Sequence, residues 1–526
     1  VTGMIKRASG MTTSSDASDG GSLIGQFGVG LFSAFMLAER LVVESRRSDC
    51  PEGVRWEAGA GTDIELSGID REEPGTTVTL HLKPQYRALA EVEEPVEQAV
   101  REFADFLNVP IHFNGATARL NVINVAWFDP TPDREAVELA IEEYFDETPL
   151  DVIPLRMETP ASIAGALYVT PQRTPGFAGE PVVTVTVRRM VISRRIQGLL
   201  PAWGSFFRGV LELQDCAPTA SREDLVRNEA FDRVRETLET RLYEHVEKLA
   251  ASDPSQFESL LTWHRYTLVG AALNDRRLRD LLRHTCKLPT SQGQLTFDEI
   301  LERSTADPLF ETDADRVVWY NTDRRQERWI NELFADREVP CVHTMRSFEE
   351  SLLATIIADD NEQGLATDLR IAAPSAPNFA QSILAMTDLE DAPGEWQQFF
   401  EATGATVQCA TFDNNQPVVA FLNERYELSK TFEAMKKAGT IPAGFERLID
   451  NHFQQSPTGQ NEIVLNRGHR LVNRALSQGC HCPLASVLRL LVLNALNSAG
   501  AAVSHESRRQ QTDDLDWIAE ALWGRD

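Results

Sequence analysis

The sequence predicts a multidomain protein of mixed α+β and α/β class. The first observation is length, because 526 residues fill roughly two to four domains of ordinary size. The second is a change of pattern along the chain: short alternating segments first, then strands mixed with amphipathic helices, then a largely helical final third. The third is the composition, with 42% hydrophobic and 25% charged residues, which is ordinary for globular domains.

The charge balance excludes several classes of partner. The net charge is −28, from 51 basic and 79 acidic residues, and it repels both nucleic acid and anionic membranes. No segment approaches the run of about 18 apolar residues that a membrane span requires, and the N-terminus does not resemble a secretory signal. We therefore expect a cytoplasmic protein with no nucleic-acid partner and no membrane partner.

The seven cysteines are scattered, which is typical of reduced thiols. Cys480-His481-Cys482 contains two possible metal ligands, but no second distant pair completes the usual zinc spacing. We interpret this segment as an ordinary loop and expect no protein-bound metal site.

The N-terminal region, residues 1–116, predicts an antiparallel sheet followed by a helix. The strands are expected at Arg40–Arg46, Val54–Ala58, Thr62–Ile69 and Thr76–Leu82. The helix is expected over Ala90–Leu107, with a short strand at Pro110–Phe113. The turn at Asn114–Thr117 marks the boundary of this domain.

Residues 117–365 predict a two-lobed α/β region. Strands are expected at Ala164–Thr170 and Val182–Ser193, and helices at Leu199–Leu213 and Glu223–Leu249. The second lobe, from about residue 255 to 360, has expected strands at Val317–Tyr320 and Val339–Val342.

Residues 366–526 follow a stretch rich in Gly, Pro and Asp around 359–377. Two strands are expected, at Ala405–Thr411 and Pro417–Leu422, before a mainly helical end. The last helices carry a broad apolar stripe: Leu484, Val487, Leu488, Leu491, Val492, Leu496, Leu515, Ile518, Ala519, Leu522 and Trp523. Such a stripe packs in the core of its own domain or against a second copy of the chain, and core packing is the commoner case.

Residues Gly25–Gly30 place three glycines in six positions, directly before the apolar segment Leu31–Met36. A glycine-rich loop at the start of a helix offers free N–H groups and a positive dipole end, which suit a phosphate. A simple tight turn before a buried helix explains the spacing about as well.

Ser221-Arg222-Glu223-Asp224 stands at the expected start of the long helix. Ser221 is a natural N-cap, and Asp224 three residues later completes a capping-box pattern. Capping does not explain Arg222, which we expect to project from the first helical turn. An arginine held there can meet a γ-phosphate and stabilise charge in a transition state.

The full string from Ser22 to Phe35 closely resembles the signature of the heat-shock protein 90 chaperone family. Residues Gly75–Leu82 and Phe206–Glu223 also resemble segments of that family. The resemblance implies part of a GHKL-type ATPase α/β sandwich, a two-lobed α/β middle domain and a helical C-terminal dimerisation domain. It also implies ATP with Mg²⁺ as ligand, a homodimer through the C-terminal helices, and non-native client proteins as partners.

The resemblance assigns site residues by position. The lid hinge that contacts the terminal phosphates falls on Gly25, Gln26, Phe27, Gly28, Val29, Gly30 and Leu31, where Leu31 replaces the usual phenylalanine. Thr76 corresponds to a threonine beside the adenine pocket, Arg222 to the catalytic arginine, and Arg189 to a second arginine near the same loop. Val226 stands where the family carries a glutamine, and Ala217-Pro218 replaces the usual proline-leucine.

Neither the general-base glutamate, the Mg²⁺-binding asparagine nor the Asp-x-Gly adenine contact of the family precedes Gly25 here. We therefore expect the chain as written to bind ATP weakly or not at all and to hydrolyse none above background. ATP with Mg²⁺ is expected as a ligand only if the missing N-terminal part is present. The favoured function is an ATP-dependent chaperone clamp, and the alternative is a non-hydrolysing holdase or scaffold. A topoisomerase II subunit or mismatch-repair protein of the same superfamily is disfavoured by charge. Trp203, Phe206 and Phe207 are candidates for client contact, although core packing is the commoner role for such phenylalanines.

Overall fold

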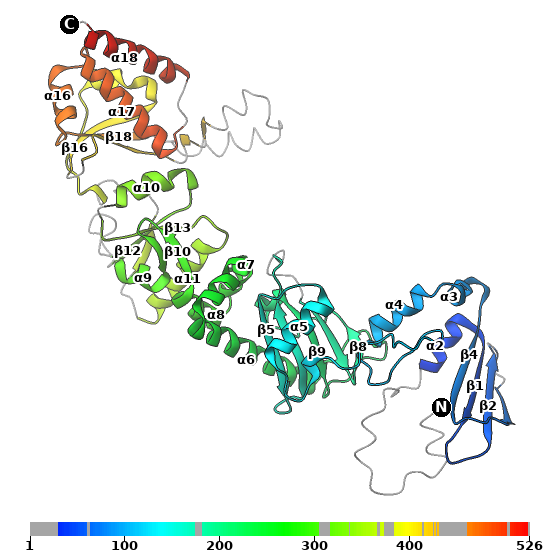
Figure 1. The fold of residues 1–526 in the computed structure, drawn as a ribbon. Helices are drawn as coiled ribbons and strands as arrows, with labels where there is room; N and C mark the ends of the chain where they lie inside the picture. Colours follow the sequence, from blue (N-terminus) through cyan, green and yellow to red (C-terminus); the bar gives the residue numbers. More distant parts are fainter. Residues whose placement is uncertain are drawn as a thin grey trace. The chain divides into compact units, whose positions relative to one another are not determined.

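The computed structural model describes residues 30–523 apart from 60, 62–63, 174–180, 305–315, 336, 365–368, 373–382, 413–414, 424–425, 428, 431–459 and 502–504. The chain forms two compact units, Val1–Thr267 and Leu268–Asp526. Figure 1 shows mixed α+β structure in both, which confirms the predicted class in its general form.

The first sheet of unit 1 follows a short helix, α2 (Gly30–Leu37), and is antiparallel throughout, as predicted. Its strand order is β3-β2-β1-β4, with β1 at Ala38–Arg46, β2 at Gly53–Gly59, β3 at Ile64–Ile69 and β4 at Gly75–Leu82. The register aligns Val43 with Trp56 on one side and with Val78 on the other, so one face is apolar. The opposite face is mostly polar but includes the buried Val42, since side chains on opposite faces alternate along each strand.

The helix predicted over 90–107 is interrupted. The structure has η1 (Pro84–Tyr86), α3 (Ala88–Glu91) and α4 (Glu94–Phe103), with Val92 extended between the two helices. Pro95 lies in the first turn of α4, where its missing N–H costs nothing, whereas its ring would clash with the carbonyl of Glu91 in a continuous helix. The predicted strand at 110–113 is reduced to a single bridge between His112 and Arg119.

The second sheet of unit 1 has the order β5-β6-β9-β7-β8. Its strands are β5 (Asp151–Met157), β6 (Ile163–Val169), β7 (Val182–Val187), β8 (Met190–Ser193) and β9 (Phe207–Leu213). The helix predicted over 199–213 is wrong: this segment holds η3 (Ala202–Phe206) followed by β9. A central strand buried on both faces has a continuous apolar run, which periodicity cannot separate from a buried helix.

The short helix η2 (Ala126–Phe128) precedes this sheet along the chain. Three longer helices belong to the same part of the structure. They are α5 (Arg134–Phe145), α6 (Glu229–Ser252) and α7 (Pro254–Ala272), and α7 crosses the division between the two units. Val137 and Ile141 of α5 share a buried cluster with Val152, Val210 and Phe106. The core of this sheet therefore includes a residue that precedes the predicted boundary at 116.

Unit 2 contains a five-stranded sheet of order β11-β10-β13-β12-β14. The strands are β10 (Lys287–Thr290), β11 (Gly293–Thr296), β12 (Arg316–Asn321), β13 (Cys341–His343) and β14 (Leu369–Ala372). The helices of this part are α8 (Arg276–Thr285), α9 (Phe297–Arg303), η4 (Arg324–Gln326), α10 (Glu327–Phe334) and α11 (Glu349–Glu362). The strands predicted near 317 and 339 are confirmed, and β14 pairs in parallel with β12.

The end of the chain combines its helices with a four-stranded sheet of order β15-β16-β18-β17, in which β15 and β18 were not predicted. Its elements are β15 (Thr387–Asp391), α13 (Gly394–Phe399), η5 (Glu401–Thr403), β16 (Ala405–Thr411), β17 (Val418–Phe421), β18 (Asn461–Asn466), α16 (Arg470–Gln478), α17 (Pro483–Ala499) and α18 (His505–Trp523). Leu488 and Val492 of α17 are fully buried in one apolar cluster with β16, β17, β18 and α10. The α17 stripe is therefore core of its own unit.

Candidate functional site

Arg222 lies in a tight loop before α6. The loop is closed by backbone hydrogen bonds from Val226 to Ala217 (2.9 Å) and from Thr219 to Asp224 (2.8 Å). Arg222 itself donates its N–H to the Thr219 carbonyl at 3.0 Å and has a left-handed backbone, with φ of 61°. The arginine is thus placed by a closed loop rather than by a helix.

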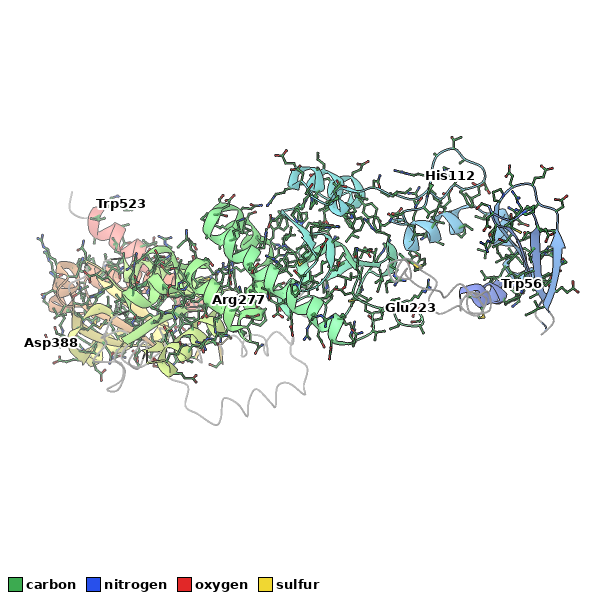
Figure 2. All side chains as sticks on the ribbon, turned by 90° about the horizontal axis from the view of Figure 1, so that it is seen from below. Trp56, His112, Glu223, Arg277, Asp388 and Trp523 are labelled. Carbon is green, nitrogen blue, oxygen red and sulfur yellow. The ribbon has the colours of Figure 1, made fainter. Side chains whose placement is uncertain are left out.

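The capping box predicted at Ser221–Asp224 is wrong. The helix α6 begins six residues later than predicted, and its N-cap is Asn228, whose side chain accepts a hydrogen bond from the Phe231 N–H at 3.1 Å. Glu223 is exposed in the loop, as Figure 2 shows. Asn is as good an N-cap as Ser, and the choice between them is decided by the loop hydrogen bonds.

A second loop, the Arg188–Arg189 turn, connects β7 to β8. Val187 pairs with Met190, so only two residues form the connection, and both are left-handed, with φ of 53° and 63°. This is the two-residue hairpin that normally requires Asn-Gly or Gly-Gly. The prediction of one continuous strand over 182–193 missed the turn, because two arginines are not a turn signal.

The two loops border one cavity of about 190 Å³, which we call the arginine cavity. Arg222 and Arg188 line it together with Val187, Met190, Ile192, Gln214, Asp215, Cys216, Ala217 and Pro218. Arg222 Nη1 lies 3.3 Å from the Met190 sulfur. Burial raises the pKa of Cys216 to about 11, so its thiol stays neutral and is no nucleophile. Two arginines against one aspartate favour an anion in this cavity.

Arg189, which the sequence analysis selected, does not line the arginine cavity. Its guanidinium carbon lies 3.6 Å from the centre of the Phe128 ring, on which it stacks. Its Nη1 atom is buried without a hydrogen-bond partner among the described residues. Burial lowers the pKa of Arg189, and the nearby Glu212 carboxylate opposes this shift. The choice between Arg188 and Arg189 depends on where the chain turns, which the sequence does not reveal.

The other predicted site residues lie elsewhere or outside the description. Gly25, Gln26, Phe27, Gly28 and Val29 are outside the described residues, while Gly30 and Leu31 begin α2. Thr76 is exposed on β4, and its hydroxyl lies 2.8 Å from that of Ser45 on β1. Of the predicted site residues that the structure describes, Arg222 alone lines the arginine cavity.

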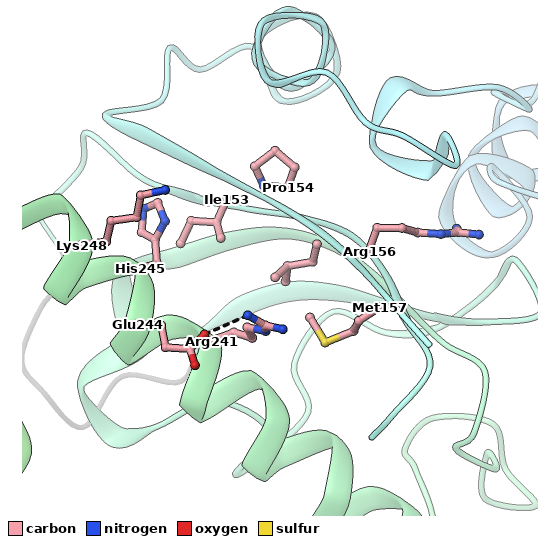
Figure 3. Close-up of a pocket in the computed structure, with 9 residues that line it drawn as sticks. Ile153, Pro154, Arg156, Met157, Arg241, Glu244, His245 and Lys248 are labelled. Atoms are coloured by element: carbon pink, nitrogen blue, oxygen red, sulfur yellow. Dashed lines mark hydrogen bonds and ion pairs between the residues drawn. The ribbon is translucent and has the colours of Figure 1, made fainter. Parts of the chain in front are cut away.

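A larger cavity of about 360 Å³ lies between β5 and α6 and is shown in Figure 3. Its basic side chains do not converge. Arg241 is paired with Glu244 at 2.9 Å, His245 contacts the buried Asp151 at 2.5 Å, and Arg156 extends away from the helix. This cavity therefore lacks a focused anion site.

The candidates for client contact are core residues. Trp203, Phe206 and Phe207 are almost completely buried and stack with one another. Within the described part of the chain, no cluster of His, Cys, Asp or Glu is arranged to hold a metal ion, and all seven cysteines, each of them described, are free thiols. None of the described helices is long and apolar enough to cross a membrane.

These features define a class: a multidomain α+β protein with an arginine-lined cavity at the second sheet of unit 1. Residues 143–307, which contain that cavity, match the family model described as Hsp90 protein. This segment therefore resembles the heat-shock protein 90 family, in agreement with the resemblance of the sequence motifs.

Named relatives agree with this assignment. The chain is 31% identical over 308 residues to the chaperone protein HtpG of Rhodopseudomonas palustris (strain BisB18), which covers 54% of this chain and 48% of that protein. It is 29% identical over 253 residues to HtpG of Chlorobium phaeovibrioides, covering 45% and 40%. It is 29% identical over 290 residues to the mitochondrial TNF receptor-associated protein 1 homolog of Dictyostelium discoideum, covering 52% and 39%. The matches thus span less than half the length of these relatives.

Proposed function

We propose that this chain is a bacterial-type heat-shock protein 90 chaperone that acts in the cytoplasm on non-native client proteins. The observation that carries the proposal is the arginine cavity, because it lies inside the segment that matches the family. Arg222 and Arg188 fit a terminal phosphate: both are cationic, both line one small cavity, and the backbone of each is held by its loop.

ATP with Mg²⁺ is the ligand that this proposal implies. Arg222 and Arg188 would hold the terminal phosphate, the Gly25–Leu31 segment would contact the phosphate chain, and Thr76 would lie near the adenine. The bound Mg²⁺ would neutralise phosphate charge. The chain's own contribution is to orient that phosphate and to stabilise charge that develops on it.

The experiment measures suppression of aggregation by the purified chain. A reporter enzyme is unfolded by heat with the chain present at equal concentration, with and without ATP and Mg²⁺, and light scattering is followed. We expect scattering to fall by half or more, and Arg222→Ala to remove any part of this suppression that depends on ATP. Arg195→Ala, an exposed arginine beyond β8, is the matched control and should have no effect.

The same experiment separates the alternative function. A non-hydrolysing holdase would suppress aggregation equally with and without ATP, and Arg222→Ala would change nothing. No suppression under either condition would contradict both forms of the proposal.

We further propose that the chain forms a homodimer through α18. Leu515 and Leu522 are 52% and 67% exposed, and Trp523, at the outer end of α18 in Figure 2, is 78% exposed. Leu515, Ile518 and Leu522 follow the spacing of one helical face, which a second copy can cover about a two-fold axis.

A further inference from the structure

Glu212 is a buried carboxylate in the middle of unit 1. It lies near the end of β9, is only 2% exposed, and both of its oxygens accept hydrogen bonds. Oε1 accepts from the Arg188 N–H at 2.7 Å, and Oε2 accepts from the Arg189 N–H at 2.9 Å. Oε2 also accepts from the Thr186 hydroxyl at 2.6 Å. Such short contacts to an ionised acceptor are strong hydrogen bonds.

The turn that Glu212 holds does not form by local preference. Arg188 and Arg189 are consecutive left-handed residues without the glycine or asparagine that such a turn normally requires. Successive N–H groups in this conformation point to one side and form a small anion-binding nest. The Glu212 carboxylate occupies that nest. It therefore stabilises a turn that Arg188 and Arg189 would not favour by themselves.

Glu212 also connects the two sides of the arginine cavity. The residues that follow it, Gln214–Pro218, line the cavity and lead directly into the loop that carries Arg222. Arg188, on the opposite side, stands on the turn that Glu212 clamps. One carboxylate thus fixes the spacing between the strand that leads to Arg222 and the turn that presents Arg188.

We propose that Glu212 is a positioning residue, which holds Arg188 toward Arg222 and so sets the affinity of the arginine cavity for a phosphate chain. The inference rests on the proposed function, because it takes phosphate as the ligand of this cavity. Glu212 itself does not touch the ligand. Its effect passes through the backbone of Arg188.

Glu147 provides a matched control in the same unit. It is also a nearly buried carboxylate with three donors: the hydroxyls of Tyr168 and Thr170 and the guanidinium of Arg208. Arg208 stands four residues before Glu212 on β9, which is about 13 Å along a strand. Glu147→Gln removes comparable hydrogen bonding, yet Glu147 does not line the arginine cavity.

The experiment titrates inorganic tripolyphosphate into the full chain by calorimetry at low salt. The variants are Arg222→Ala, Arg188→Ala, Glu212→Gln, Glu147→Gln and the double variant Glu212→Gln with Arg188→Ala. In Glu212→Gln, an NH₂ group replaces one of the two carboxylate oxygens. A donor then faces a backbone N–H of the turn, and the hydrogen bond between them is lost. We expect about tenfold weaker binding in Glu212→Gln, no change in Glu147→Gln, and no further loss when Glu212→Gln is added to Arg188→Ala.

A second measurement follows the hydrogen bonds between Glu212 and the Arg188–Arg189 turn without any ligand. Amide hydrogen exchange of Arg188 and Arg189 should be slow in the wild type and in Glu147→Gln, and faster in Glu212→Gln. Unchanged exchange of these two amides in Glu212→Gln would contradict the claim that Glu212 holds the turn. An equal loss of affinity with and without Arg188 would overturn positioning, because the effect would then be general destabilisation.

The outcomes also separate this inference from the proposed function. If the wild type binds tripolyphosphate, Arg222→Ala does not, and Glu212→Gln binds as the wild type does, the role of Glu212 is overturned and the phosphate site stands. If Arg222→Ala binds as well as the wild type, or if the wild type does not bind at all, the phosphate site is overturned and the role of Glu212 with it.

Discussion

Three arginines in strained backbone conformations surround one small region of unit 1. Arg188, Arg189 and Arg222 are three of the eight non-glycine residues with positive φ among those described. Each left-handed residue costs roughly 1–2 kcal/mol, and such strain concentrates where a site needs a fixed geometry. The strain therefore supports the arginine cavity as a functional site independently of sequence motifs.

Arg222→Gly separates strain from function. Glycine adopts φ of 61° without a steric penalty, so the free energy of unfolding should stay within about 1 kcal/mol of the wild-type value. Tripolyphosphate binding should be lost, because the guanidinium is gone. Urea denaturation and calorimetry measure the two quantities, and retained binding in this stable variant would rule out Arg222 as the anion ligand.

His264 predicts a pH dependence of stability. It is buried, stacks on Phe206 at 4.3 Å and contacts the Thr170 carbonyl at 2.9 Å. Burial lowers the pKa of His264 to about 4, against an ordinary value near 6.5, while the Thr170 hydrogen bond opposes this shift. Between these pH values the unfolded chain binds the proton and the folded chain does not, so stability falls as the pH drops from 6.5 toward 4.

Comparison with His264→Gln isolates this contribution. Glutamine retains a donor for the Thr170 carbonyl but does not titrate. The wild type should therefore lose about 3 kcal/mol more than the variant between pH 7 and pH 4, as two denaturation series measure. Parallel pH profiles would show that His264 is not the titrating group.

At the scale of single residues, the sequence analysis selected Arg222, which lines the arginine cavity, and Arg189, which does not. Arg188 and Arg189 are chemically identical and adjacent. Which of them lines the cavity is decided by the two-residue turn, and that turn depends on Glu212, some twenty residues away in sequence. Local patterns carry no signal for such a long-range contact.

At the scale of elements, prediction succeeded where polar and apolar residues alternate along a strand and failed where both faces of a strand are buried. The first sheet shows the success, because polar and apolar residues alternate from Thr77 to Leu82 along β4. The strand β9 was predicted as helix, because Phe207, Val210 and Leu211 are all buried in the centre of the second sheet.

The close contact between β6 and β9 depends on two glycines. A Cβ atom at Gly209 would lie 2.1 Å from the Ala166 carbonyl oxygen, and one at Gly165 would lie 2.1 Å from that of Val210. Gly209→Ala should therefore destabilise unit 1 by about 3 kcal/mol or more. Gly68→Ala, in strand β3 with open space around it, is the control and should change stability by less than about 1 kcal/mol. Thermal unfolding of both variants compares them directly, and equal melting temperatures would contradict the packing argument.

Helix α18 is held on α17 by a buried ion pair. Asp514 accepts hydrogen bonds from the Ser486 hydroxyl at 2.6 Å and from Arg489 at 2.8 and 3.0 Å. Asp514→Ala leaves Arg489 without its carboxylate, which should cost about 3–5 kcal/mol and release α18, since Asp514 supplies the hydrogen bonds to Ser486 and Arg489 of α17. Hydrogen exchange along α18 measures the release. Asp513→Ala, its exposed neighbour, should leave exchange unchanged, and equal effects of the two variants would show that the ion pair does not hold the helix.

At the scale of the whole molecule, tertiary contacts cross the domain boundaries that the sequence patterns predict. The predicted boundaries at 116 and 365 follow turns and composition. In the structure, Phe106 packs in the core of the second sheet, and β14 extends the sheet of β12. The α10 residue Trp329 makes an edge-to-face contact with Phe421 of β17, with 5.8 Å between the ring centres. Tertiary packing therefore joins segments that turns and changes of composition separate in the sequence.

The proposed dimer depends on which face α18 turns outward. Asp514 faces α17, and Leu515 follows it about 100° around the helix, so the ion pair that anchors α18 also leaves Leu515 and Leu522 exposed. Deleting the chain from Cys482 onward would remove α17 and its buried Leu488, so substitutions on α18 are the cleaner test.

Leu515→Glu combined with Leu522→Glu should convert a dimer into a monomer at micromolar concentration without loss of fold, because both side chains are exposed in the single chain. The wild-type dimer should persist at high salt, since an apolar interface is not screened as surface charge is. Asp516→Asn with Glu520→Gln, on another exposed face of the same helix, is the control and should remain dimeric. Sedimentation velocity at low and high salt measures all three proteins. A monomeric wild type, or a double glutamate variant that stays dimeric, would show that α18 does not form the interface.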